Sequence, residues 1–123
     1  LNNMFAFILG CLYLISALII LFLIKEKFNI LGFIYNQNNK NFLLIFDVPF
    51  LLISFAAIFE TAHWFIFIIF LMHALNSITL LLKPEFFYQS KGEMQLMDET
   101  TLKNYLVIIS SVIGLGCLLI SYF

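Results

Sequence analysis

Two ionisable residues lie within long apolar stretches of this 123-residue sequence and are the first candidates for chemistry. Asp47 is the only acidic residue well inside an apolar run, and His73 lies near the middle of a later one. An ionisable side chain inside lipid costs at least about 2.5 kcal/mol, and such residues commonly belong to proton relays. We therefore predict that Asp47 and His73 are proton-relay residues that face other helices.

Both residues also have a purely structural interpretation. Asp47 is followed by Val48 and Pro49, a pattern typical of a helix N-cap with a proline in the first turn, which would place Asp47 near the membrane interface. His73 and Asn76 are three residues apart and form one polar stripe, so hydrogen bonds to a neighbouring helix explain them as well, at about 0.6 kcal/mol each. The sequence leaves both interpretations open.

Glu60 and His63 lie three residues apart between two apolar runs and are candidate polar helix contacts, although a solvated turn explains them equally. Thr61 is a suitable N-cap for the helix that follows. His63 and His73 would lie about 15 Å apart along one helix, so they cannot ligate the same haem iron. Because zinc patterns, phosphate-binding loops and nucleophile triads are also missing, we expect no metal, no cofactor and no catalysis by this chain alone.

The elements that carry these residues are apolar enough to lie in lipid. Hydrophobic residues make up 63% of the sequence and charged residues 11%, a balance that a water-soluble chain of this length could not cover. A helix from residue 42 to residue 82 would be about 60 Å long, twice the membrane, so a tight turn near residues 60–63 must divide it. The predicted fold class is all-α, a polytopic membrane protein forming a single membrane domain over residues 1–123. Its four transmembrane helices are expected at about residues 4–24, 42–59, 62–82 and 102–123, with polar loops at 25–41 and 83–101.

Small residues on the last helix predict a packing face. Ser110, Gly114, Cys117 and Ser121 recur at intervals of four, three and four, which lets another helix approach closely. Both cysteines lie in apolar runs, so no disulfide is expected. Candidate N-caps for this helix are Asp98, Thr100 and Thr101.

The distribution of lysine predicts the orientation of the helices. The six basic residues are all lysines, and with four spans they fall on one side of the membrane, which the positive-inside rule assigns to the cytoplasm or the mitochondrial matrix. The sequence has no basic cluster, so nucleic acid is not an expected partner. The expected partner is the lipid bilayer. The absence of arginine and the sixteen phenylalanines fit an AT-rich genome such as that of an organelle. These lysines are Lys25, Lys27, Lys40, Lys83, Lys91 and Lys103.

Two segments resemble a known family. Residues 21–31, with the sequence LFLIKEKFNIL, resemble the end of the first helix and the short basic loop of subunit 4L of NADH:ubiquinone oxidoreductase, respiratory complex I. Residues 73–82, with the sequence HALNSITLLL, are similar to the pattern of that family's third helix, and the resemblance covers roughly residues 8–84. It implies a subunit of the membrane arm in the mitochondrial inner membrane, with other membrane subunits of a large hetero-oligomeric complex as partners.

The sequence departs from that family at the residues that matter most for function. The family carries one Glu in its second helix and one in its third, as part of a proton-conducting axis, whereas His73 occupies the third-helix position here. The second-helix position is occupied by Asn38 or, in a shifted alignment, by Asp47. The fourth helix is additional to the three of that family. The resemblance therefore implies proton translocation through substitute residues. The alternative is a structural accessory subunit with no chemistry of its own.

Overall fold

Over the residues that this computed structural model describes, which are 3–94 and 99–122, the chain folds into helices and forms no strand. Four helices are long and apolar enough to cross a membrane, so the predicted fold class is confirmed. They are α1 (Met4–Lys25), α3 (Lys40–Thr61), α4 (Trp64–Leu82) and α6 (Glu99–Tyr122). Three short elements lie in the connections: α2 (Ile30–Ile34), the 3₁₀ turn η1 (Gln37–Asn39) and α5 (Pro84–Met94).

The second membrane helix is not broken at Pro49. Helix α3 runs without interruption from Lys40 to Thr61, with Pro49 inside it, although the proline has no N–H to donate to the carbonyl of Ile45. Asp47 therefore lies in the interior of a continuous helix and is buried. The N-cap interpretation of Asp47 is wrong because the helix begins seven residues earlier, at Lys40.

The turn between α3 and α4 is tight, as the helix lengths require, but the residue that caps α4 is not the predicted one. Thr61 is the last residue of α3, and Ala62 takes a left-handed conformation with φ of 50°, which ends that helix. His63 is the N-cap of α4, where its Nδ1 accepts a hydrogen bond from the backbone N–H of Phe65 at 3.1 Å. Thr61 is therefore not the cap, because the left-handed residue shifts the start of α4 beyond it.

Both predicted polar loops contain a short helix that the sequence patterns did not indicate. The side chain of Asn29 caps α2 by accepting a hydrogen bond from the backbone of Gly32 at 3.0 Å. The ring of Tyr35 stacks on that of Phe87 in α5, with 5.5 Å between the ring centroids, and so links the two connections. Burial raises the pKa of the Tyr88 hydroxyl in α5 above its usual range.

The start of α6 also differs from its prediction. Thr100 and Thr101 lie within the helix and do not cap it, because α6 already includes Glu99. Asp98, the third predicted cap, lies outside the described residues.

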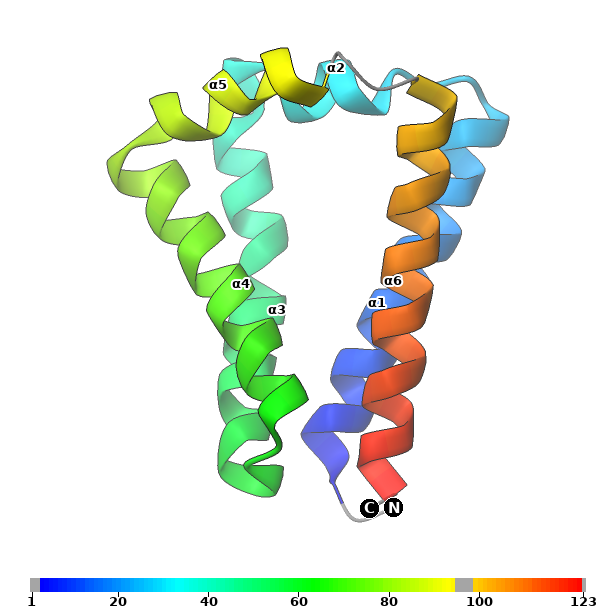
Figure 1. The fold of residues 1–123 in the computed structure, drawn as a ribbon, viewed down its shortest axis with the longest axis vertical. Helices are drawn as coiled ribbons and strands as arrows, with labels where there is room; N and C mark the ends of the chain where they lie inside the picture. The colour runs from blue at the N-terminus through cyan, green and yellow to red at the C-terminus, as the bar shows by residue number, and fades with distance from the viewer. Residues whose placement is uncertain (1–2, 95–98, 123) are drawn as a thin grey trace.

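The four long helices form two pairs that meet at one end of the molecule (Figure 1). Helices α1 and α6 lie side by side, as do α3 and α4, and the pairs diverge toward the end that carries α2 and α5. At the converging end the backbone N–H of Asn3 donates to the carbonyl of Ser121 at 3.0 Å, and that of Phe5 donates to the carboxylate of Glu60 at 2.9 Å. The connections from α1 to α3 and from α4 to α6 therefore share the opposite end.

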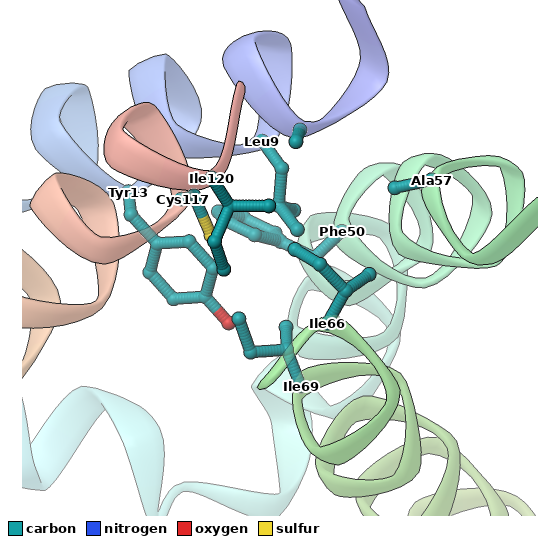
Figure 2. Close-up of a cluster of buried hydrophobic side chains, with 9 residues drawn as sticks. Leu9, Tyr13, Phe50, Ala57, Ile66, Ile69, Cys117 and Ile120 are labelled. Carbon is teal, nitrogen blue, oxygen red and sulfur yellow. The ribbon is translucent and has the colours of Figure 1, made fainter. Parts of the chain in front are cut away.

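A core of buried side chains joins the two pairs (Figure 2). Leu9 and Tyr13 from α1 and Cys117 from α6 contact Phe50 from α3 and Ile66 from α4. Outside this core, each long helix exposes large apolar side chains along its length, which would be unfavourable in water but suits lipid. The chain is an integral membrane protein. Examples of these exposed side chains, one from each helix in chain order, are Leu18, Ile45, Leu75 and Leu119.

The small residues of α6 lie where that helix meets α1. A Cβ atom at Gly10 would stand 2.8 Å from the carbonyl oxygen of Gly114, so the two backbones are in close contact. Cys117 and Ser121 are fully buried, and Ser110 is half-buried. The four small residues predicted as one packing face therefore lie in two environments, because Ser110 lines a cavity whereas the others are buried.

A candidate polar site within the membrane

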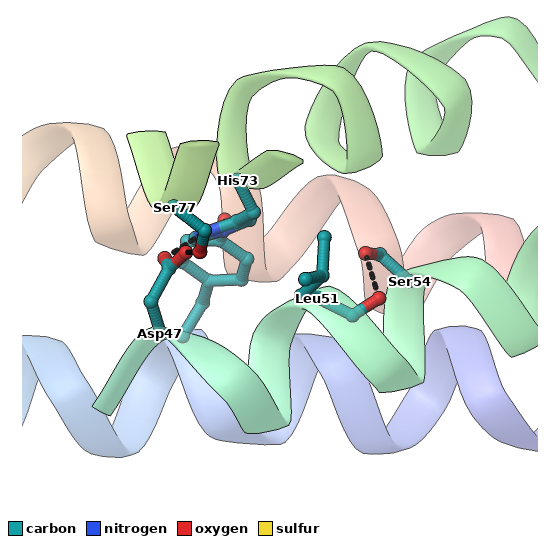
Figure 3. Close-up of polar contacts among 6 residues, drawn as sticks. Asp47, Leu51, Ser54, His73 and Ser77 are labelled. Atoms are coloured by element: carbon teal, nitrogen blue, oxygen red, sulfur yellow. Dashed lines mark hydrogen bonds and ion pairs between the residues drawn. The ribbon is translucent and has the colours of Figure 1, made fainter. Parts of the chain in front are cut away.

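Asp47 and His73, predicted separately as relay residues, are hydrogen-bonded to each other. The Nδ1 of His73 lies 2.6 Å from the Oδ1 of Asp47. The hydroxyl of Ser77 donates to the other carboxylate oxygen of Asp47, as Figure 3 shows. The hydroxyl of Tyr13 is hydrogen-bonded to the Nε2 of His73. Four polar side chains therefore form one continuous network, which we call the Tyr13–Ser77 network.

Helical spacing explains why these residues meet. His73 and Ser77 are four residues apart on α4 and so share the face that packs against α3. Asp47 lies on the facing side of α3, and Tyr13 reaches the same point from α1. The network therefore joins three transmembrane helices.

The network is largely buried. Asp47 is 6% exposed and Ser77 is 7% exposed. The ring of Phe50 stacks on that of His73, with centroids 5.1 Å apart and planes at 19°, and meets the ring of Tyr13 edge-on at 5.0 Å. These contacts exclude water from one side and fix the orientation of the imidazole. A carboxylate at this depth is tolerable because both of its oxygens accept hydrogen bonds.

Both ring nitrogens of His73 take part in the network, and this determines what it can do chemically. If Nδ1–H donates to Asp47, Nε2 accepts the hydroxyl proton of Tyr13. If Nε2 also carries a hydrogen, it donates to the phenol oxygen, and the Tyr13 hydroxyl is free to donate elsewhere. A proton can thus pass between the side of the ring that faces α1 and the carboxylate on α3 without any movement of the helices.

A half-open cavity of about 420 Å³ adjoins this network. It lies between the diverging helix pairs, and its lining is mostly apolar side chains from α1, α2, α3 and α6. Tyr13, Asp47 and His73 supply polar atoms to its wall, with Ser16 and Ser110. The network is therefore accessible from a cavity within the membrane rather than sealed on all sides.

The other predicted polar contacts lie elsewhere. Glu60 accepts a hydrogen bond from the backbone of Phe5, and His63 caps α4, so each has a partner of its own at the converging end of the molecule. Asn76 is half-buried on α4, but Ser77, the next residue, is the one that binds Asp47. Among the described residues, no group of three or more His, Cys, Asp or Glu side chains is placed to hold a metal ion.

Two members of the network, Tyr13 and Ser77, were not among the predicted site residues. Ser77 is four residues after His73, a spacing that places both on one helical face and would have been a usable signal. Tyr13 has a hydroxyl within an otherwise apolar helix, but nothing in its sequence surroundings distinguishes it from the other tyrosines. Its role depends on the packing of α1 against α3 and α4.

Comparisons with known proteins add no relatives. No protein-family model matches this chain, and no curated protein or solved structure matches it either. The resemblance to complex I subunit 4L therefore rests on the residues of this sequence.

Proposed function

We propose that this chain is a membrane-arm subunit of a respiratory-chain complex, most like subunit 4L of complex I, in which the Tyr13–Ser77 network takes part in proton translocation. The observation that carries the proposal is the hydrogen bond of 2.6 Å between Asp47 and His73, inside the membrane and extended to α1 by Tyr13. Buried ionisable residues in direct hydrogen-bond contact are an arrangement through which a proton can pass.

The family resemblance supports the same assignment. In subunit 4L one Glu of the second helix and one of the third belong to the proton-conducting axis. The third-helix position here is His73, and the second-helix position is Asn38 or, in a shifted alignment, Asp47. The side chains of His73 and Asp47 contact each other although they are 26 residues apart. An Asp–His pair can hold and release a proton as a pair of carboxyl groups can.

The proposed location is the mitochondrial inner membrane, with the lysine-containing connections in the matrix. Lys25, Lys27, Lys40 and Lys83 lie at or beyond helix ends on the side of α2 and α5. A shared side for these charges is what the positive-inside rule leads us to expect. The electron transfer itself, from NADH to ubiquinone, would take place in other subunits.

The experiment is to substitute Asp47→Asn in the assembled complex and to measure proton pumping and electron transfer together. Asparagine keeps the size of the side chain but cannot take up a proton. We expect at least a several-fold fall in protons pumped per electron, because one member of the path no longer exchanges its proton. Tagged chain purified with its partners should co-purify with subunits of NADH:ubiquinone oxidoreductase.

The matched control is Glu60→Gln, which also removes one carboxylate but at the converging end of the molecule, outside the network. Its proton yield should equal that of the unchanged protein. A normal yield in the Asp47→Asn complex would rule out the relay.

A structural accessory subunit is the second candidate, and one observation favours it. Both oxygens of Asp47 and both nitrogens of His73 already have partners within this chain, so the network also serves to hold three helices together. On this reading the Asp47→Asn complex would be less stable but would pump normally. The pumping ratio therefore separates the two candidates.

A further inference from the structure

A second pocket lies at the diverging end of the molecule, where the end of α1 meets the start of α6. Its volume is about 360 Å³, and it is half-open. The residues that line it carry two ammonium groups, two carboxamides and one hydroxyl, and none of the described residues of its lining is acidic. We propose that this pocket binds the phosphate group of an anionic phospholipid. Its lining residues are Ile24, Lys27, Asn29, Thr100, Lys103 and Asn104.

Helical spacing brings three of these residues together. Lys103 and Asn104 follow Thr100 by three and four residues, so all three share one face near the start of α6. Lys103 is half-buried on this face, whereas Thr100 and Asn104 are exposed. The face meets the end of α1 because α1 and α6 lie side by side (Figure 1). Two helices that are far apart in the sequence therefore build the pocket.

Lys27 is placed at the pocket by the way in which α1 ends. The backbone N–H of Lys27 donates to the carbonyl of Ile24 at 3.0 Å, and that of Phe28 donates to the carbonyl of Leu23 at 2.9 Å. These bonds terminate the helix with Lys27 in the left-handed region, at a φ of 56°. Glycine is the residue favoured there, because a Cβ atom is unfavourable in this conformation. The turn itself therefore does not account for a lysine at this position.

The lining offers hydrogen-bond donors to an anion. A lysine ammonium carries three N–H donors and no acceptor. The carboxamide oxygen of Asn29 accepts a hydrogen bond from the backbone N–H of Gly32 at 3.0 Å, so its NH₂ group is the part that adds donors to the pocket. The non-bridging oxygens of a phosphate diester share a negative charge, and hydrogen bonds between ionised groups are stronger than neutral ones. The donors and the charge of the pocket therefore match a phosphate.

The position of the pocket selects a phospholipid as the source of that phosphate. Helix α1 ends at Lys25 and α6 begins at Glu99, so the pocket lies where two membrane spans leave the hydrocarbon. Basic pockets between transmembrane helices at this depth bind anionic lipid headgroups. Ile24 lies about one turn before Lys27, toward the middle of the membrane, and provides an apolar side chain for the glycerol ester region. A phosphate compound without an apolar part would gain nothing from that contact.

The test uses the full chain in nonionic detergent micelles with a phosphatidylglycerol that carries a photoreactive group next to its phosphate, followed by mapping of the labelled peptides. We expect labelling at the end of α1 and at the start of α6. Lys27→Gly should weaken binding about tenfold, because it removes one ammonium group from the pocket. The thermal stability of this variant should be equal or higher, since glycine suits the left-handed turn. Lys103→Gln removes the other ammonium group and should weaken binding by about the same factor.

The matched control is Lys25→Gln. Lys25 lies in the last turn of α1, where it interacts with the same helix dipole as Lys27, but it is outside the lining of the pocket. General attraction to an anionic lipid would fall equally in the two variants, because each loses one positive charge at the same helix end. Binding in the pocket should fall for Lys27→Gly alone, and Lys25→Gln should label as the unchanged chain does.

Competition separates the possible sources of negative charge. Unlabelled phosphatidylglycerol should displace the probe, whereas oleate, phosphatidylcholine and inorganic phosphate at the same concentration should not. Oleate has an acyl chain and a carboxylate but no phosphate. Phosphatidylcholine has a phosphate beside a fixed cation, which the two lysines repel. Inorganic phosphate has no apolar part to contact Ile24.

Three results would overturn the inference. The first is labelling that Lys27→Gly and Lys103→Gln leave unchanged, and the second is an equal loss of labelling in Lys25→Gln. The third is displacement by oleate, phosphatidylcholine or inorganic phosphate that equals displacement by phosphatidylglycerol. Binding is measured without reference to proton pumping, so failure of the lipid site and failure of the proposed relay are seen in different measurements.

Discussion

Asp47 depends on its two hydrogen-bond donors, His73 and Ser77, because a carboxylate buried to this degree cannot be left unpaired at low cost. Its neighbours also restrict the imidazole of His73, since Phe50 stacks on the ring and the hydroxyl of Tyr13 holds its other nitrogen. At the scale of the residue, therefore, each side chain of the site is held in place by its neighbours. Changing one member should alter the contribution of the next.

A double-mutant cycle between Ser77 and Asp47 should reveal this coupling. Ser77→Ala removes one hydrogen bond to the carboxylate and should lower the free energy of unfolding by about 1 kcal/mol. In a chain that already carries Asp47→Leu, the same change should cost close to zero, because its acceptor is gone. Unfolding in mixed detergent micelles provides the measurement.

Ser54→Ala is the matched control for this cycle. Ser54 is also a buried serine of the α3–α4 pair, but its hydroxyl donates to the carbonyl of Leu51 on its own helix, at 3.0 Å. It lies about 10 Å along α3 from Asp47. The loss in unfolding free energy caused by Ser54→Ala should be the same with and without Asp47→Leu. If Ser54 and Ser77 showed equal coupling to Asp47, the network would carry no specific interaction.

At the scale of the elements, the backbones of α1 and α6 are in close contact where Gly10 faces Gly114. Close backbone contact increases dispersion between helices in lipid, where burial of apolar surface provides no driving force between them. The α1–α6 pair is therefore held by its small residues. The α3–α4 pair is held by its short turn and by the hydrogen bonds of Asp47.

Gly10→Ala should separate α1 from α6. The added Cβ would stand 2.8 Å from the carbonyl oxygen of Gly114, a backbone atom that cannot turn aside, and overpacking of this kind costs about 1 to 3 kcal/mol. Gly116→Ala is the matched control, since its Cβ meets the ring of Phe65, the end of a side chain that can rotate. The unfolding free energy should fall clearly more for Gly10→Ala, and an equal fall would contradict this account of the interface.

At the scale of the whole molecule, the two helix pairs converge at the termini and diverge toward α2 and α5 (Figure 1). At the converging end the hydrogen bond of Phe5 with Glu60 joins the two pairs, and that of Asn3 with Ser121 joins the start of α1 to α6. The diverging end holds the cavity and, beside it, the connections that carry lysine. Access to the polar network is therefore asymmetric across the membrane.

The orientation of the whole chain can be tested with a membrane-impermeant reagent for amines. The proposed orientation predicts lysine labelling in inverted inner-membrane vesicles and none in mitochondria whose outer membrane alone has been opened, because it places all the lysines on the matrix side. Lys25, Lys27, Lys40 and Lys83 are the positions to follow by mass spectrometry. Labelling from both sides would contradict the four-span topology, and labelling only from the opposite side would reverse the proposed orientation.

The sequence alone determined the number of spans and their approximate ends. Apolar runs of about 20 residues leave few alternatives when backbone groups must be satisfied inside lipid, and the turn near residues 60–63 followed from length. Asp47 and His73 were identified for a similar reason, since a charge within such a run is costly wherever the helix points. The short helices α2 and α5 were missed because local caps such as Asn29 decide them.

Only the tertiary structure decided which faces of the helices meet. The spans are apolar on nearly all sides, so no hydrophobic stripe marks an inner face, and the sequence leaves the rotation of each helix free. The packing of α1 against α3 and α4 brings Tyr13 to His73, and the continuity of α3 through Pro49 places Asp47 beside Ser77. The cavity exists because the two pairs diverge, a property of the assembled helices that no single segment encodes.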